Sequence, residues 1–163
     1  YGNALQAASA EGHQEIVNLL LNNGADVNAQ GGYYGNALQA ASAEGHQDIV
    51  NLLLNNGADV NAQGGYYGNA LQAASAEGHQ DIVNLLLNNG ADVNAQGGEY
   101  GNALQAASQE GHQEIVNLLL NKGADVNAQG GRYGNALQAA SQEGHQEIVN
   151  MLQRRGAITL PPP

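Results

Sequence analysis

Residues 34–66 read YGNALQAASAEGHQDIVNLLLNNGADVNAQGGY, and the chain of 163 residues consists of nearly five copies of this 33-residue unit. Each neighbouring unit differs from it at a single position, whereas the fourth and fifth units differ more. We divide the chain into units 1–33, 34–66, 67–99, 100–132 and 133–157, followed by a tail of residues 158–163. Self-similarity with a period of 20–50 residues predicts a solenoid or array rather than a globule.

Each unit predicts two helices and a loop. Asn36 is a strong helix N-cap, and the alanine-rich residues 37–43 after it favour a short helix that Gly45 ends. A second helix is expected from about His46 to Asn55, with a wide apolar stripe formed by Ile49, Val50, Leu53 and Leu54. Residues 58–66 have the composition of turns and predict a hairpin-like loop.

Neither helix can bury its apolar face alone, so neighbouring units must stack and bury these faces between them. The small side chains of Ala37, Ala40 and Ala41 should let adjacent first helices approach closely. The sequence therefore predicts an all-α repeat, a solenoid of five 33-residue helix–turn–helix–loop units that forms a single domain over residues 1–163.

The pattern GHxxIVxLLLxxGADVNA stands in the first four units and resembles the ankyrin repeat, and the resemblance extends over the fifth unit, which reads GHQEIVNMLQRRGA. The family pattern Thr-Pro-Leu-His-x-Ala-Ala is replaced in residues 36–42 by Asn-Ala-Leu-Gln-Ala-Ala-Ser, which keeps a capping group. The variant YGNALQAAS with GADVNAQGG resembles ankyrin arrays of filamentous fungi, many of which form the C-terminus of NACHT-type NOD-like receptors. The resemblance implies an ankyrin-type α-solenoid in the cytoplasm that binds a protein on its concave face.

Composition narrows the class of protein further. The chain contains no Cys, which excludes disulfides and Cys-ligated zinc. No apolar run approaches the ~18 residues of a membrane span, and no signal peptide is visible at Tyr1. Because the chain starts without Met and within the pattern, we interpret it as a fragment with further repeats or another domain upstream.

Charge is distributed unevenly along the chain. Residues 1–121 contain twelve acidic residues and no Lys or Arg, and all four basic residues lie in 122–163. The acidic part should repel nucleic acid and anionic membranes, which are bound through Lys and Arg. Two interpretations stay open: the acidity attracts a basic partner, or it only keeps an array rich in Asn and Gln dispersed.

No residues predict catalysis, a cofactor or a metal site. One His recurs in every unit, namely His13, His46, His79, His112 and His145. Packed helices lie ~8–10 Å apart, whereas zinc needs each ligand nitrogen at ~2.1 Å, so neighbouring His residues cannot share an ion. We expect them to hydrogen-bond the turn between helices. Acidic pairs such as Glu44 and Asp48 predict a solvated helix face, and Gly64-Gly65 is a turn without the P-loop pattern.

Positions that vary between near-identical units are candidates for ligand contact. One such slot lies near the end of the first helix and holds Ala10, Ala43, Ala76, Gln109 and Gln142. Another lies at the loop tip and holds Tyr33, Tyr66, Glu99 and Arg132, beside Tyr34 and Tyr67. A third slot varies only between Glu and Asp, and a fourth lies near the end of the second helix. By the ankyrin resemblance, the first two slots map to the concave face, and Tyr and Arg are enriched in binding hot spots. Neutral drift of exposed positions is the alternative.

The two ends of the array differ. In the first unit, the outer face with Leu5, Ile16 and Val17 is expected to have no neighbour. In the last unit, Gln153 replaces a Leu and predicts a polar cap, and the proline triplet 161–163 is expected to end the array.

The function predicted is non-enzymatic recognition of a protein ligand. By resemblance, the array would be the ligand-sensing region of a fungal NOD-like receptor of the innate-immunity or heterokaryon-incompatibility type. The alternative is a designed or natural structural scaffold, or an oligomerisation spacer, without a specific ligand.

Overall fold

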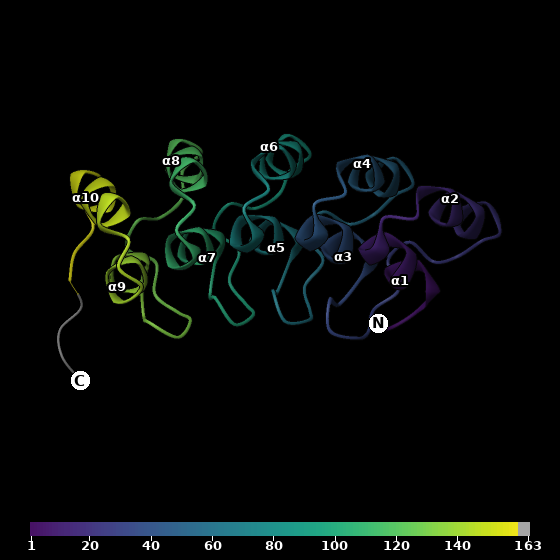
Figure 1. Cartoon of the computed structure of the whole chain (residues 1–163), viewed down its shortest axis with the longest axis horizontal. Helices are drawn as coiled ribbons and strands as arrows, with labels where there is room; N and C mark the ends of the chain where they lie inside the picture. The colour runs from purple at the N-terminus through teal and green to yellow at the C-terminus, as the bar shows by residue number, and fades with distance from the viewer. Residues whose placement is uncertain (160–163) are drawn as a thin grey trace.

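The computed structural model describes residues 1–159, which form ten helices in five pairs. The helices are α1 (Ala4–Glu11), α2 (Gln14–Asn22), α3 (Ala37–Glu44), α4 (Gln47–Asn55), α5 (Ala70–Glu77), α6 (Gln80–Asn88), α7 (Ala103–Glu110), α8 (Gln113–Asn121), α9 (Ala136–Gln142) and α10 (Gln146–Arg154). Figure 1 shows the pairs in a curved row, with the odd-numbered helices in one layer and the even-numbered helices in the other. The predicted all-helical solenoid is confirmed.

Helix ends are fixed by the residues that the sequence indicated. The Asn36 side chain accepts a hydrogen bond from the amide of Gln39 at 2.9 Å, and an Asn caps each of the other odd-numbered helices in the same way. Gly45 ends α3 in the left-handed region, at φ 81°, where a side chain would be strained. Each pair therefore starts and stops on local chemistry that its own unit supplies.

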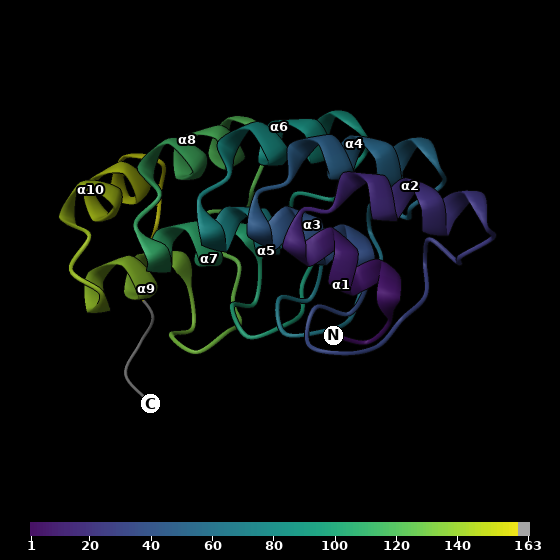
Figure 2. The ribbon, with the colours of Figure 1, turned by 45° about the vertical axis from the view of Figure 1, so that its right-hand side comes forward.

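Residue size explains the curvature of the row. The odd-numbered helices pack closely on one another through buried alanines such as Ala37 and Ala41. The even-numbered helices carry Ile, Val and Leu and touch one another much less. The odd-numbered helices consequently form the inner, concave side of the arc, and the loops project beside them (Figures 1 and 2).

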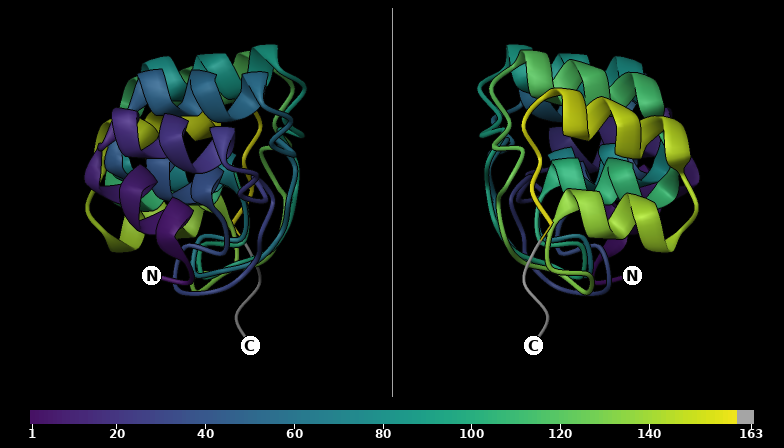
Figure 3. Two further views of the ribbon diagram at one scale, coloured as in Figure 1. Left: turned by 90° about the vertical axis from the view of Figure 1, so that its right-hand side faces the viewer. Right: turned by 90° about the vertical axis from the view of Figure 1, so that its left-hand side faces the viewer.

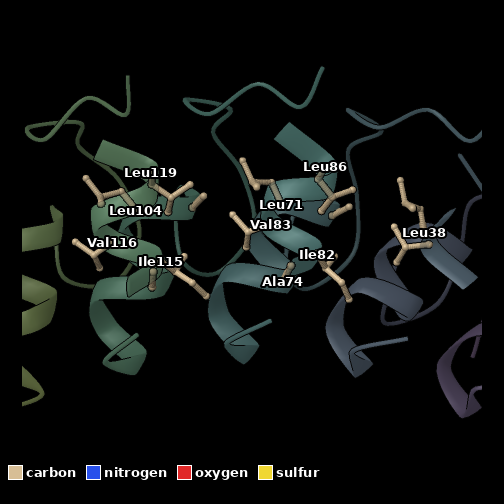
Figure 4. Packing of buried hydrophobic residues seen from close by; sticks show 14 of the residues in the cluster. Leu38, Leu71, Ala74, Ile82, Val83, Leu86, Leu104, Ile115, Val116 and Leu119 are labelled. Carbon is tan, nitrogen blue, oxygen red and sulfur yellow. The ribbon is translucent and has the colours of Figure 1, made fainter. Parts of the chain in front are cut away.

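The core is a strip that runs through all five pairs. Leu71 of α5 and Val83 and Leu86 of α6 gather between the helices of the third unit (Figure 4). Equivalent residues of the other units join them in one continuous cluster. Viewed from its ends, the array shows the pairs stacked one behind another (Figure 3). Each unit thus buries its apolar residues between its own two helices and against the neighbouring units, and this stacking is what the sequence predicted.

Loops are tied to one another by a ladder of asparagines that the sequence did not reveal. Within each loop two glycines pair as in an antiparallel hairpin, for example Gly31 with Gly35. Asn28 then reaches the next unit, where its amide donates to the Gly57 carbonyl at 3.0 Å and its oxygen accepts from the Asp59 amide at 2.8 Å. Asn61, Asn94 and Asn127 repeat the arrangement.

The exposed face of the first unit is smaller than expected. Leu5 and Val17 are buried because they pack towards the second unit, so that part of the prediction is wrong. Ile16 is 48% exposed and Leu19 is 60% exposed, and these residues do form an apolar end face. At the other end of the array Gln153 is exposed, as predicted for a cap. The proline triplet 161–163 lies outside the described residues.

Candidate binding surface

Tyrosines form a continuous ladder along the concave side. We define the tyrosine ladder as Tyr1, Tyr33, Tyr34, Tyr66, Tyr67 and Tyr100. Each lies two or three residues before the N-cap Asn of an odd-numbered helix, and all except Tyr1 follow a loop between units. The loops that carry them project beside those helices in Figure 1. The hairpin and the Asn N-cap together fix the backbone position from which each tyrosine ring projects.

Rings of equivalent residues stack on one another. The centroids of Tyr1 and Tyr34 lie 6.3 Å apart, those of Tyr33 and Tyr66 lie 5.0 Å apart, and those of Tyr67 and Tyr100 lie 6.4 Å apart. Edge-to-face contacts link the two rows, because Tyr33 meets Tyr34 at 5.3 Å and Tyr66 meets Tyr67 at 5.1 Å. Aromatic pairs of this geometry contribute about 0.5–1.5 kcal/mol each. The ladder is therefore a preorganised surface.

In each unit a tyrosine hydroxyl also donates a hydrogen bond to a glutamate. Tyr34 donates to Glu44 at 2.5 Å, Tyr67 to Glu77 at 2.7 Å and Tyr100 to Glu110 at 3.0 Å. The same bond joins Tyr1 to Glu11 and Tyr133 to Glu143. Burial and the bond to Glu77 raise the pKa of Tyr67 well above its usual value. All five of these glutamates are exposed, so a row of carboxylates runs beside the rings.

The ladder has a buried base and an exposed edge. Tyr67 and Tyr100 are almost fully buried, whereas Tyr1, Tyr33 and Tyr66 are 66%, 52% and 38% exposed. Backbone bonds align the tips, since the Tyr66 amide donates to the Tyr33 carbonyl at 2.8 Å. The exposed rings are therefore held on a rigid support.

The remaining tip residues, Glu99 and Arg132, are also exposed. The Glu99 amide donates to the Tyr66 carbonyl at 3.0 Å, so this tip is aligned with the tyrosine tips before it. The Arg132 guanidinium carbon lies 5.4 Å from the centroid of the Tyr133 ring, which is a cation–π contact.

The predicted slot near the end of the first helix is largely covered. Ala10, Ala43 and Ala76 are buried, and Ala43 and Ala76 pack in one cluster with Tyr67 and Tyr100. The mapping of this slot to an exposed surface is wrong for the alanines, which are buried, and tyrosines pack against Ala43 and Ala76. Gln109 is half-buried and Gln142 is exposed. The tyrosine–glutamate bonds were missed, although a Tyr and a Glu ten residues apart in every unit were the available signal.

The histidines tie neighbouring units together. His46 Nε2 donates to the Ala10 carbonyl of the preceding unit at 3.0 Å, and His79, His112 and His145 repeat the bond. The structural role expected for them is confirmed, although the partner is the neighbouring helix end rather than the turn. Across residues 1–159, no group of three or more His, Asp or Glu side chains is placed to hold a metal ion.

A family model described as Ankyrin repeats (3 copies) matches residues 1–64 and 70–159. The chain belongs to the ankyrin-repeat family. Ankyrin repeats generally mediate protein–protein interaction and are generally non-catalytic. A search among curated proteins gave no match. None of the helices described here is long and apolar enough to cross a membrane.

Proposed function

We propose that this ankyrin array is a non-enzymatic module that recognises a protein ligand on its concave face. The observation that carries the proposal is the tyrosine ladder, whose outer rings are exposed while its inner rings are buried and packed against alanines. Tyr supplies a large contact area at low cost in side-chain entropy and is enriched among binding hot spots. A ligand that covers these rings would gain affinity without having to order them.

The tips themselves support recognition over a purely structural role. Tyr33, Tyr66 and Glu99 occupy the same backbone position in successive units, and the same backbone hydrogen bond joins each to the next. The fold therefore accepts either a ring or a carboxylate at this position. Arg132 adds a fourth side chain to the series. Variation where the backbone is constant is what a ligand-contacting edge would show.

We further propose that the array is the ligand-sensing region of a fungal NOD-like receptor of the innate-immunity or heterokaryon-incompatibility type, working in the cytoplasm. Its support is the near-identity of the units and their resemblance to such arrays. Nucleotide-driven chemistry would then belong to another domain of the receptor. The acidity of residues 1–121 supports a protein ligand over nucleic acid or an anionic membrane.

A structural spacer that oligomerises through its ends is the second candidate, and exposed Ile16 and Leu19 favour it. Sedimentation velocity over a range of protein concentrations separates the two candidates. A concentration-dependent shift that Ile16→Ser abolishes supports association through this end face. A constant monomer supports the recognition module.

The test of recognition uses a displayed library of random peptides selected against the whole chain. The tip variant carries Tyr33, Tyr66, Glu99 and Arg132 changed to Ala. Selected peptides should bind the native chain and lose binding to the tip variant, while circular dichroism and melting change little. A control variant changes the exposed Asn18, Asn51 and Asn117 of the even-numbered helices to Ala and should keep binding. Peptides that bind both variants equally would place recognition elsewhere, and an unfolded tip variant would make the tips structural.

A further inference from the structure

Carboxylates lie beside the ladder without a basic residue nearby in sequence. Glu11, Glu44, Glu77 and Glu110 are exposed, and each accepts from a tyrosine hydroxyl. Residues 1–121 contain no Lys or Arg that could neutralise them. Along the first four units, the ladder therefore combines aromatic rings with a row of negative charges.

The junction between the fourth and fifth units shows what complements such a surface. There Arg132 stands at the loop tip, its guanidinium carbon lies 5.4 Å from the centre of the Tyr133 ring, and the Tyr133 hydroxyl donates to Glu143. Cation, ring and carboxylate are thus assembled within the chain itself. In the earlier units the ring and the carboxylate are present, but the tip holds Tyr33, Tyr66 or Glu99 in place of a cation.

The tyrosines that bind the carboxylates are spaced more widely than the tip rings of Tyr33 and Tyr66, which stack at 5.0 Å. The tyrosines that bind the carboxylates stack at 6.3 Å (Tyr1 with Tyr34) and 6.4 Å (Tyr67 with Tyr100). Side chains on one face of an extended strand recur every second residue, which is about 6.6 Å. A helical turn advances only about 5.4 Å, and three residues of polyproline helix advance about 9.3 Å. Alternate residues of an extended segment therefore match the step from the first unit to the second and the step from the third unit to the fourth.

We propose that the ladder binds an extended protein segment with arginine at alternate positions, each guanidinium pairing with one exposed carboxylate and lying against the exposed edge of the ladder. The inference rests on the proposed function, since it names the ligand class of the same surface. Arginine fits better than lysine because its planar guanidinium stacks on rings and pairs with carboxylates at two points. The face of the segment that carries no arginine points to solvent and is unconstrained.

The test measures binding of labelled synthetic peptides to the whole chain by fluorescence anisotropy. The alternating peptide carries arginine and threonine in strict alternation. The blocked peptide has the same composition with its arginines contiguous, and a third peptide has lysine in place of arginine. We expect the alternating peptide to bind about tenfold more tightly than either, and its affinity to fall about tenfold or more as salt rises to about 0.5 M.

Two variants that remove equal charge localise the effect. The ladder variant carries Glu44→Gln, Glu77→Gln and Glu110→Gln, and the glutamine oxygens can still accept from the tyrosines. The control carries Asp48→Asn, Asp81→Asn and Glu114→Gln, all exposed in the first turns of even-numbered helices. We expect the ladder variant to lose about tenfold in affinity and the control less than about twofold.

Each outcome decides between the two proposals. Equal loss in both variants would show diffuse attraction to an acidic protein and overturn the inference. Equal binding of alternating and blocked peptides would overturn the spacing argument. If no basic peptide binds while the library peptides still depend on the tips, the proposed function stands and only this inference fails. If neither depends on the ladder, both fail.

Discussion

Leu86→Ala should weaken the array more than most single changes. Leu86 has no exposed surface and packs with Leu71 and Val83 between the helices of the third unit (Figure 4). Buried Leu→Ala changes cost about 2–5 kcal/mol, and the cost rises when neighbours cannot move into the cavity. Alanines such as Ala74 of α5 already lie at close approach to the next helix, so we expect little collapse and a loss of about 3–5 kcal/mol.

Urea unfolding followed by circular dichroism measures this loss. With a slope of about 2 kcal/mol per M, the midpoint should fall by roughly 1.5–2.5 M. Leu85→Ala is the matched control, because Leu85 is the preceding residue of α6, makes the same chemical change and is only partly buried. It should lose less than half as much. An unmoved midpoint for Leu86→Ala, or an equal loss for Leu85→Ala, would refute the assignment of the buried helix face.

Three further outcomes are expected. Gly57 and Gly68 share φ +89°, but a Cβ on Gly57 meets nothing within 4 Å whereas one on Gly68 lies 2.8 Å from the Gly97 carbonyl carbon. Gly57→Ala should therefore cost only about 1–2 kcal/mol, the cost of the left-handed backbone, and Gly68→Ala should cost more. Equal melting temperatures for the two variants would contradict this. Asn61→Ala removes two hydrogen bonds to the next unit and should cost about 1–2 kcal/mol by urea titration, and an unmoved midpoint would show that these bonds do not stabilise the array. Burial and the bond to Glu77 raise the pKa of Tyr67, so folding favours the protonated phenol. This contribution to stability is complete below about pH 10 and is lost as the pH rises further. Tyr67→Phe should therefore flatten the alkaline fall in melting temperature, and an unchanged fall would assign it to other groups.

The fold could be predicted because its determinants lie within one unit. Asn36, Gly45 and the apolar stripe of the second helix each act over a few residues, and the period shows that they recur. The burial of Ala43 could not be predicted in this way. It depends on how far the array bends, and the bend brings tyrosines of neighbouring units over an alanine that looks exposed on an isolated helix.

The candidate surface could be predicted only in part, because some of its contacts also lie between units. The loop tips were indicated by their variation, and the structure places Tyr33, Tyr66, Glu99 and Arg132 on an exposed edge. Contacts between units carry no such signal. Asn28 and its equivalents are constant polar residues in a turn, which local chemistry alone already explains, and their partners lie a whole unit away.

The asparagine ladder makes the array independent of its own length. Each loop is joined to the next by the same two asparagine hydrogen bonds, and every interior interface repeats the one before it. If one whole unit were added to the interior or removed from it, every junction would still join two units through the same contacts. Recombination between near-identical coding segments could therefore lengthen or shorten the chain in steps of 33 residues without any compensating substitution. Each step would add or remove one loop tip, so the length of the exposed edge could change while its packing stayed the same.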